Sequence, residues 1–209
     1  MRFLIADDHP IIGVALGEML AAALGEGAVK VDTVDSGESV LHALARSSYD
    51  CLVLDLDMPG HPRSVPLVAA AAQARPGLRI VIYTGHAHPC LALAAIEAGA
   101  QAYVSKASGA RLALDAIRTT MGGERFMDPA IDLDLARNHV WRRLSPNERS
   151  ILLSLARGEN LQALAIDSQR SYKTVTAHKY NAIRKLGLRS NAEIGPFLAR
   201  HGLDYLLDA

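Results

Sequence analysis

The sequence predicts an α/β fold, a doubly wound (βα)5 domain over residues 1–122, followed by an all-α domain over residues 144–209. In the first part, short apolar runs alternate with longer Ala- and Leu-rich stretches that have helical spacing. This alternation is typical of βα units in a parallel sheet. Several of the short runs end directly at an acidic, hydroxyl or lysine side chain. After about residue 122 the composition changes, and helix signals replace strand signals.

Five strands are expected to begin near residues 2, 29, 51, 79 and 102. The helices that follow them are expected over residues 10–23, 37–45, 65–74, 90–98 and 110–121. Strands joined in this way lie parallel, with helices on both faces of the sheet. Residues 123–143 contain Gly123, Pro129 and several charges without a convincing period, so we interpret them as a linker with room for a short helix.

Four helices are expected in the domain over residues 144–209. The first has the strongest start signal, because Ser145 suits the N-cap, Pro146 suits the first helical position and Glu148 completes a capping box. The other three are expected over residues 161–167, over residues 171–186, and after a second capping box formed by Ser190 and Glu193.

Composition narrows the class of protein. Half of the 209 residues are apolar, which is enough for a packed core without disulfides. No stretch approaches the roughly 18 apolar residues of a membrane span, and the start of the chain has no signal-peptide pattern. Cys51 lies in a strand run and Cys90 at a helix start, so their spacing indicates neither a disulfide nor a zinc site. We expect a cytoplasmic protein with no membrane partner.

The formal net charge is zero, but the two parts of the chain differ in sign. Residues 1–140 hold 11 Lys and Arg against 16 Asp and Glu, whereas residues 141–209 hold 11 against 6. An acidic first part and a basic second part indicate a metal or phosphate site joined to a nucleic-acid binder.

The ends of four strand runs carry side chains that suit phosphate and hard cations. Because the carboxyl ends of parallel strands meet at one edge of a sheet, we expect these side chains to converge. Asp7, Asp8 and Asp55 offer the carboxylates that Mg²⁺ prefers. If Asp55 is the nucleophile that accepts a phosphoryl group, Thr84 and Lys106 are placed to bind its oxygens. Acids and small polar residues also end strands without any function, but four such ends in one sheet favour a site.

At these positions the sequence resembles the flavodoxin-like receiver domain of bacterial two-component response regulators. The motifs that carry the likeness, over about residues 1–122, are Asp7-Asp8, Asp55-Leu-Asp-Met-Pro-Gly60, Thr84-Gly85 and Gly99-Ala-Gln-Ala-Tyr-Val-Ser-Lys106. The likeness implies that a sensor histidine kinase phosphorylates Asp55 and that Thr84 and Tyr103 form a switch. It also implies Mg²⁺ bound by Asp7, Asp8, Asp55 and the backbone carbonyl of Asp57.

Other side chains compete for a role at the same edge. Asp57 is a second possible acceptor, but Asp55 ends the apolar run, so we expect Asp57 at the rim, where its charge affects hydrolysis of the acyl phosphate. His86 follows Thr84 by two residues and is placed to meet the phosphoryl group or its attacking water. His61, His86, His88 and Cys90 share these loops and could bind zinc. No pair among them has the tight spacing of a structural zinc site, which favours solvated loop residues.

The basic helix expected over residues 171–186 is a candidate for binding double-stranded DNA. A helix of this kind can lie in the major groove and read bases with its N-terminal residues. By composition alone, a solvated basic helix explains it equally well. The motifs Leu144-Ser-Pro-Asn-Glu148, Ala156-Arg-Gly158, Ser171-Tyr-Lys-Thr-Val-Thr-Ala-His178 and Ile183-Arg-Lys-Leu-Gly187 resemble the LuxR-type helix-turn-helix, which joined to a receiver domain defines the NarL/FixJ family.

This second likeness implies roles for the residues of the basic helix. The implied DNA-binding residues are Lys173, Thr174, Thr176, Lys179, Tyr180, Arg184 and Lys185. The implied packing residues are Val175, Ile183 and Leu186, and the last helix is the implied dimer contact. Residues 160–170 depart from the family pattern, with two polar residues at expected core positions and Ala163 in place of the usual Glu. We therefore expect this element to be short or loosely packed.

The sequence thus predicts a DNA-binding transcriptional response regulator, a homodimer on a two-fold promoter site when Asp55 is phosphorylated. It is an enzyme only in catalysing its own phosphotransfer and dephosphorylation. One alternative is a phosphorylation-independent or heterodimerising regulator whose divergent helix-turn-helix acts mainly through protein partners. A metal-dependent phosphatase is a further alternative, which the lack of substrate-binding insertions disfavours.

Overall fold

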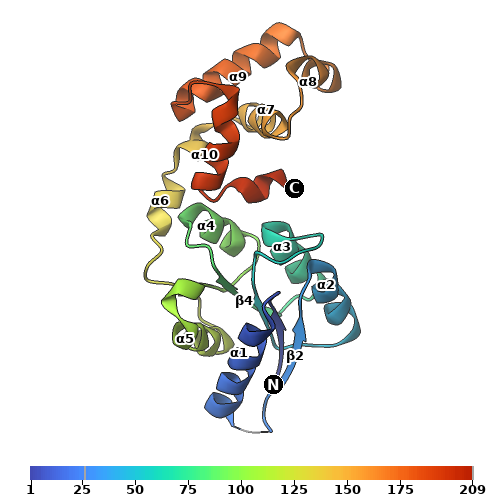
Figure 1. Ribbon diagram of the computed structural model, residues 1–209, viewed down its shortest axis with the longest axis vertical. Coiled ribbons are helices and arrows are strands. Elements are labelled where there is room, and N and C mark those ends of the chain that lie inside the picture. The colour runs from blue at the N-terminus through green and yellow to red at the C-terminus, as the bar shows by residue number, and fades with distance from the viewer. Residues whose placement is uncertain (26, 209) are drawn as a thin grey trace. The chain divides into compact units, whose positions relative to one another are not determined.

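The computed structural model describes residues 1–25 and 27–208 (Figure 1). Its contacts divide the chain into two units, Met1–Asp132 and Leu133–Ala209. The division falls inside residues 123–143, the segment expected to be a linker, so a part of that segment belongs to each unit.

The first unit is built on a parallel sheet, which has six strands in the described residues, in the order β2-β1-β3-β4-β5-β6. The strands are β1 (Arg2–Ala6), β2 (Lys30–Val34), β3 (Cys51–Leu54), β4 (Arg79–Thr84), β5 (Ala102–Ser105) and β6 (Phe126–Met127). The first five lie where the sequence predicts them. Because β1 lies between β2 and β3, the strand order reverses beside β1. Ligands of open α/β sheets bind outside the carboxyl ends of the strands at such a reversal.

Helices cover both faces of this sheet. They are α1 (Pro10–Leu24), α2 (Gly37–Arg46), α3 (Ser64–Ala74), α4 (Pro89–Glu97) and α5 (Ala110–Met121). Helices α1 and α5 pack together on one side, and α2, α3 and α4 pack in a row on the other (Figure 1). Leu16 and Leu20 of α1 and Ile117 of α5 share a core cluster with Phe3 and Ile5 of β1, which are alternate residues of that strand. The expected doubly wound architecture is confirmed.

The sixth strand, β6, was not predicted. It lies inside the expected linker and pairs with β5 in parallel, with Phe126 N–H donating to the carbonyl of Gln101 over 3.1 Å and Asp128 N–H donating to the carbonyl of Tyr103 over 2.9 Å. Two residues are too few to show a strand period, and Gly122 and Gly123 before them indicate a loop. The segment therefore extends the sheet at its β5 edge.

The second unit is helical. Its helices are α6 (Leu133–Arg137), α7 (Pro146–Ala156), α8 (Leu161–Asp167), α9 (Tyr172–Leu186) and α10 (Ile194–Arg200). The capping box of α7 is present: Ser145 Oγ accepts from Glu148 N–H over 3.3 Å, and Glu148 Oε2 accepts from Ser145 N–H over 2.7 Å. As expected, α8 is short, and in it only Ala165 is buried.

The second expected capping box is wrong. Ser190 makes no side-chain cap within the described part of the chain, and the Glu193 carboxylate accepts from Arg189 N–H over 2.9 Å instead. A 3-10 turn, Asn191–Glu193, occupies the expected first turn, and α10 begins at Ile194. Across both units, no helix that the structure describes combines the length and apolarity needed to cross a bilayer.

Candidate functional site

Two carboxylates and one ammonium group meet at the carboxyl edge of the sheet. Asp55 N–H donates to the carbonyl of Ala6 over 2.8 Å, which continues the β1–β3 pairing and sets Asp55 beside Asp7. The side chains of Asp7 and Asp55 are each only 3% exposed. Lys106, directly after β5, places its Nζ 2.6 Å from Asp55 Oδ2 and 2.7 Å from Asp7 Oδ2. The ammonium group therefore bridges two buried carboxylates that come from different strands.

This arrangement keeps Lys106 charged. Burial opposes protonation of the ammonium group, but the hydrogen bonds to Asp55 and Asp7 and the charges of these carboxylates outweigh it, so the pKa of Lys106 lies above its usual value. A fixed cation beside Asp55 can bind phosphoryl oxygens without first gaining a proton.

A candidate cation site lies next to the bridge. Ligand atoms of Asp7, Asp8, His9 and Asp55 all lie within 4.8 Å of one another. His9 was not singled out from the sequence; its Nδ1 lies 2.7 Å from Asp8 Oδ1, and its N–H donates to Asp7 Oδ1 over 2.9 Å. Three carboxylates suit a hard cation such as Mg²⁺, and His9 restrains two of them. The donor set therefore fits the ion that the sequence predicts.

The two residues expected to form a switch are both buried. Thr84 is 0% exposed, and its Oγ1 has no hydrogen-bond partner among the described residues. Tyr103 is also fully buried and its hydroxyl donates to the carbonyl of His86 over 3.0 Å. Burial, together with the charge of Asp55, raises the pKa of the Tyr103 phenol, which stays a neutral donor. An unpaired buried hydroxyl is costly, so Thr84 Oγ1 is available to a new acceptor at this edge.

Asp57 lies at the rim. Its side chain is 71% exposed, its N–H donates to Asp55 Oδ1 over 3.1 Å, and its Oδ2 lies 3.1 Å from His86 Nε2. Exposed Asp57 and half-buried His86 thus flank the buried acceptor. The candidate cation site includes none of the loop residues considered for zinc, His61, His86, His88 and Cys90.

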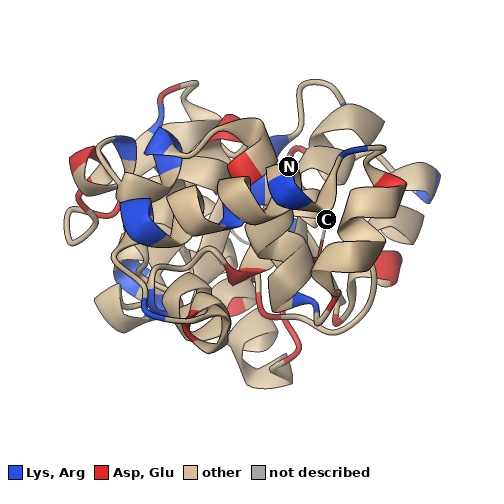
Figure 2. Cartoon of the chain, turned by 90° about the horizontal axis from the view of Figure 1, so that it is seen from above, with Lys and Arg blue, Asp and Glu red and all other residues tan. Residues whose placement is uncertain are grey.

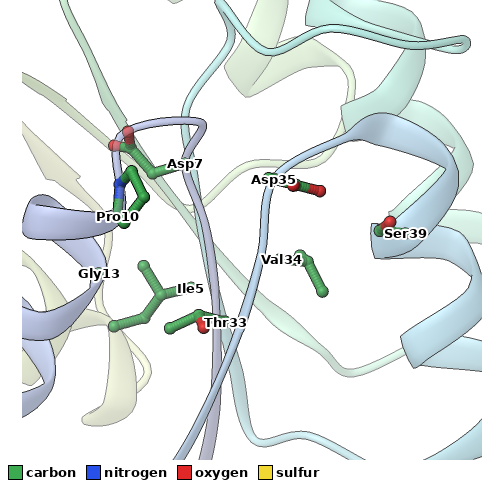
Figure 3. A pocket seen from close by; sticks show the side chains of 8 residues that line it. All are labelled: Ile5, Asp7, Pro10, Gly13, Thr33, Val34, Asp35 and Ser39. Atoms are coloured by element: carbon green, nitrogen blue, oxygen red, sulfur yellow. The ribbon is translucent and has the colours of Figure 1, made fainter.

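A cavity of about 310 Å³ reaches the same edge from between β1, α1, β2 and α2. Figure 3 shows Asp7 and Asp35 towards one end of it and Ile5 and Thr33 towards the other. Asp7 therefore borders both the Lys106 bridge and this cavity.

In the second unit, Ser171 is the N-cap of α9, and its hydroxyl accepts from Thr174 N–H over 3.1 Å. Gly187, in the left-handed conformation, is the C-cap. Val175, Ile183 and Leu186 are buried, as expected. Figure 2 colours the charged residues, and basic segments lie on several helices. Of the expected DNA-binding residues, those exposed on α9 are Lys173, Thr174, Tyr180, Arg184 and Lys185.

Two expected DNA-binding residues, Lys179 and Thr176, are less exposed than the others. Lys179 is only 9% exposed, and its Nζ lies 4.0 Å from the centroid of the Tyr180 ring. The physical reason is helical spacing, because Lys179 follows buried Val175 by four residues and precedes buried Ile183 by four. The hydroxyl of Thr176 is buried without a partner in the described residues. Lys179 therefore lies off the exposed face of α9, whereas Thr176 is half-buried and stays an expected DNA-binding residue.

Lys185 has a partner inside its own unit. Its Nζ lies 2.8 Å from Glu148 Oε2, and the Glu148 side chain is only 5% exposed. Burial favours the protonated form of Glu148, but the hydrogen bonds from Lys185 and Ser145 outweigh it and lower the pKa of the carboxyl. The capping carboxylate of α7 is therefore also the anchor of the C-terminal end of α9.

Comparisons with known proteins match a different family to each of the two units. Residues 3–118 match the response regulator receiver domain family, and residues 142–195 match the bacterial regulatory proteins of the luxR family. The chain is 26% identical to the response regulator GacA of Pseudomonas aeruginosa, over 97% of each protein. It is 24% identical to the response regulator UvrY of Escherichia coli, over 97% of this chain and 95% of UvrY.

Solved structures of RcsB have the same fold. One of them is RcsB from Salmonella enterica serovar Typhimurium bound to promoter P1flhDC in the presence of the phosphomimetic BeF3⁻. The match spans 100% of this chain and 98% of the RcsB chain, with a TM-score of 0.67 and 25% sequence identity. A structure of two RcsB dimers bound to two parallel DNAs covers 95% of this chain and 98% of its own, with a TM-score of 0.66 and 25% identity.

A doubly wound receiver domain with a buried Asp–Lys–Asp cluster, joined to a LuxR-type helix-turn-helix, defines a transcriptional response regulator of a two-component system. This chain belongs to the NarL/FixJ family of these regulators.

Proposed function

We propose that this regulator is switched by transfer of a phosphoryl group from a sensor histidine kinase to Asp55. The observation that carries the proposal is the bridge from Lys106 to Asp55 and Asp7, which joins an acceptor and a cation at one edge of the sheet. In the transfer, an Asp55 oxygen forms the bond to phosphorus while the bond from phosphorus to the donor nitrogen breaks. Lys106 then exchanges its carboxylate contact for a phosphoryl oxygen.

Asp7, Asp8 and Asp55, with the backbone carbonyl of Asp57, would hold Mg²⁺. The ion would screen the repulsion between the Asp55 carboxylate and the incoming phosphoryl oxygens. Thr84 and Tyr103 are the proposed switch, because Thr84 Oγ1 lacks a partner among the described residues and gains one if it turns to a phosphoryl oxygen. Self-phosphotransfer and autodephosphorylation at Asp55 are the extent of the catalysis we propose.

The same proposal covers the output. Phosphorylation favours a homodimer whose paired α9 helices bind a two-fold promoter site. The proposed contacts are Lys173, Thr174, Tyr180 and Arg184, which are exposed; Lys185 reaches DNA only at the expense of its bond to Glu148. The family likeness supports this output and the expected cytoplasmic location.

Phosphoryl transfer from a small phosphodonor tests the acceptor. Wild type, Asp55→Asn and Asp57→Asn are incubated with Mg²⁺ and acetyl phosphate, and the covalently bound, hydroxylamine-labile phosphate on each protein is measured by mass spectrometry. We expect wild type and Asp57→Asn to be labelled and Asp55→Asn to remain unlabelled. Labelling of Asp55→Asn but not of Asp57→Asn would make Asp57 the acceptor, and no labelling of any of the three would favour the phosphorylation-independent alternative.

A further inference from the structure

Asp128, directly after β6, is a buried acid that the phosphoryl chemistry does not use. It is only 1% exposed, and it precedes by four residues the end of the first unit at Asp132. Its Oδ2 accepts from Ser105 N–H over 3.0 Å, and its Oδ1 accepts from Ala130 N–H over 2.9 Å. The Asp128 carboxylate thus joins the end of β5 to the residues that follow β6, close to the end of the first unit.

The carboxylate remains charged in this buried position. Burial opposes its ionisation, but hydrogen bonds from Ser108, Ala130 and Ser105 outweigh that effect and lower the pKa of Asp128. Strand pairing does not require this charge, because β6 is already held through main-chain bonds such as Asp128 N–H to the carbonyl of Tyr103. A buried charge with a full set of donors fixes geometry more strictly than a neutral side chain does.

The two serines that Asp128 binds flank Lys106. Ser105 ends β5 immediately before Lys106, and Ser108 ends the 3-10 turn Lys106–Ser108. Lys106 Nζ in turn contacts Asp55. A continuous set of contacts therefore leads from the acceptor through the Lys106 turn and Asp128 to the segment that joins the two units.

We propose that Asp128 is a positioning residue that couples the Lys106 turn to the interdomain segment. This inference rests on the proposed phosphorylation of Asp55. When Lys106 moves from the carboxylates to a phosphoryl oxygen, the turn moves with it, and Asp128 transmits that movement to residues 128–132. The residue touches neither the acceptor nor the phosphoryl group, so its effect falls on the DNA-binding response and not on phosphoryl binding.

The test measures the gain in DNA affinity that beryllofluoride produces with Mg²⁺, in the full chain. The variants are Asp128→Asn, which keeps the shape but replaces one acceptor by a donor, and Ser108→Ala, which removes one donor and is the milder change. Asp134→Asn is the matched control, because it removes an equal charge from a residue whose side chain is 75% exposed six positions away. Beryllofluoride binding is measured separately by ¹⁹F NMR.

A coupling of about 5- to 150-fold is usual for such a switch, and we expect a gain in this range in wild type and Asp134→Asn. In Asp128→Asn we expect the gain to fall below about twofold, and in Ser108→Ala to an intermediate value, with beryllofluoride still bound by both. A merely structural role would weaken DNA binding equally with and without beryllofluoride and would leave the ratio unchanged. That result would overturn the inference, as would loss of beryllofluoride binding in the variants.

The outcomes separate this inference from the proposed function. If wild type itself binds beryllofluoride without any gain in DNA affinity, the phosphorylation switch fails and the role of Asp128 fails with it. If wild type shows the gain and Asp128→Asn shows the same gain, the switch stands and only the role of Asp128 is refuted.

Discussion

Replacing Lys185 by Met should destabilise the second unit through Glu148 and leave the salt dependence of DNA binding unchanged. Lys185 Nζ lies 2.8 Å from the Glu148 carboxylate, whose side chain is 5% exposed and which also accepts from Ser145 N–H. The change leaves the buried carboxylate without its charged partner, so that Ser145 is its remaining hydrogen-bond donor among the described residues. We therefore expect the substitution to weaken the contact between α7 and α9 and not a contact with DNA phosphates.

The size of the effect follows from the exposure of the pair. A hydrogen bond to a charged group contributes about 1.5–3 kcal/mol to stability. The Lys185 side chain is 41% exposed, so solvent screening lowers the expected coupling with Glu148 to about 1–2 kcal/mol. The pKa of Glu148 is lower in the folded state than in the unfolded state. The stabilisation by the Lys185–Glu148 pair is therefore fully present above the unfolded-state pKa of about 4.3 and is lost as the pH falls through the folded-state pKa.

A double-mutant cycle with Glu148→Gln and Lys185→Met measures the coupling. The single tryptophan of the chain, Trp141, is buried in the second unit, so urea unfolding followed by its fluorescence reports on that unit. A coupling below about 0.3 kcal/mol at pH 7, within the additivity of independent sites, would refute the reasoning. So would a Lys185→Met variant of unchanged stability whose DNA affinity depends less on salt, since Lys185 would then be a phosphate contact.

Three further changes have definite expected outcomes. Lys173→Ala, at an exposed position of α9, should lower the salt slope of DNA binding by about 1 without changing the unfolding midpoint; an unchanged slope would remove Lys173 from the interface. Asp8→Asn should weaken Mg²⁺ binding, measured by calorimetry, by at least about tenfold, and equal heats in both proteins would contradict the cation site. Burial and the neighbouring His201 lower the pKa of His139. The free energy of unfolding of the second unit should therefore decline as the pH falls below the pKa of an unfolded histidine, about 6.5, because protonation then favours the unfolded state. Melting followed by Trp141 fluorescence at pH 7.5 and 5.5 should show this decline in wild type and less of it in His139→Gln, and the same decline in both would be evidence against His139 as its source.

Sequence patterns predicted the elements whose signals are local and long. Strands β1, β3, β4 and β5 are apolar runs, and the helices after them have clear spacing, so their positions agree with the structure within a residue or two. Strand β6 was not predicted, because two residues are too few to show a strand period and because its pairing depends on β5, which lies more than 20 residues earlier. Asp128 was missed for the same reason, since its partners are Ser105 and Ser108 on another strand end.

The candidate site shows the same limit. Convergence of Asp7, Asp55 and Lys106 followed from the rule that parallel strands end at one edge, and the structure brings these residues within hydrogen-bond distance. Exposure on α9 is less predictable, because the family likeness assigns Lys179 to DNA, whereas its spacing from Val175 places it on the buried face. The partner of Lys185 could not be predicted, because Glu148 lies 37 residues away and its sequence pattern indicates only a helix cap.

The central claim is that a phosphoryl group on Asp55 drives DNA binding, and one comparison tests it most directly. The mass in solution and the promoter affinity of wild type and Asp55→Asn are measured with Mg²⁺, with and without beryllofluoride. The account predicts that beryllofluoride makes wild type dimerise and bind DNA more tightly and leaves Asp55→Asn unchanged. Identical behaviour of the two proteins under both conditions would contradict it.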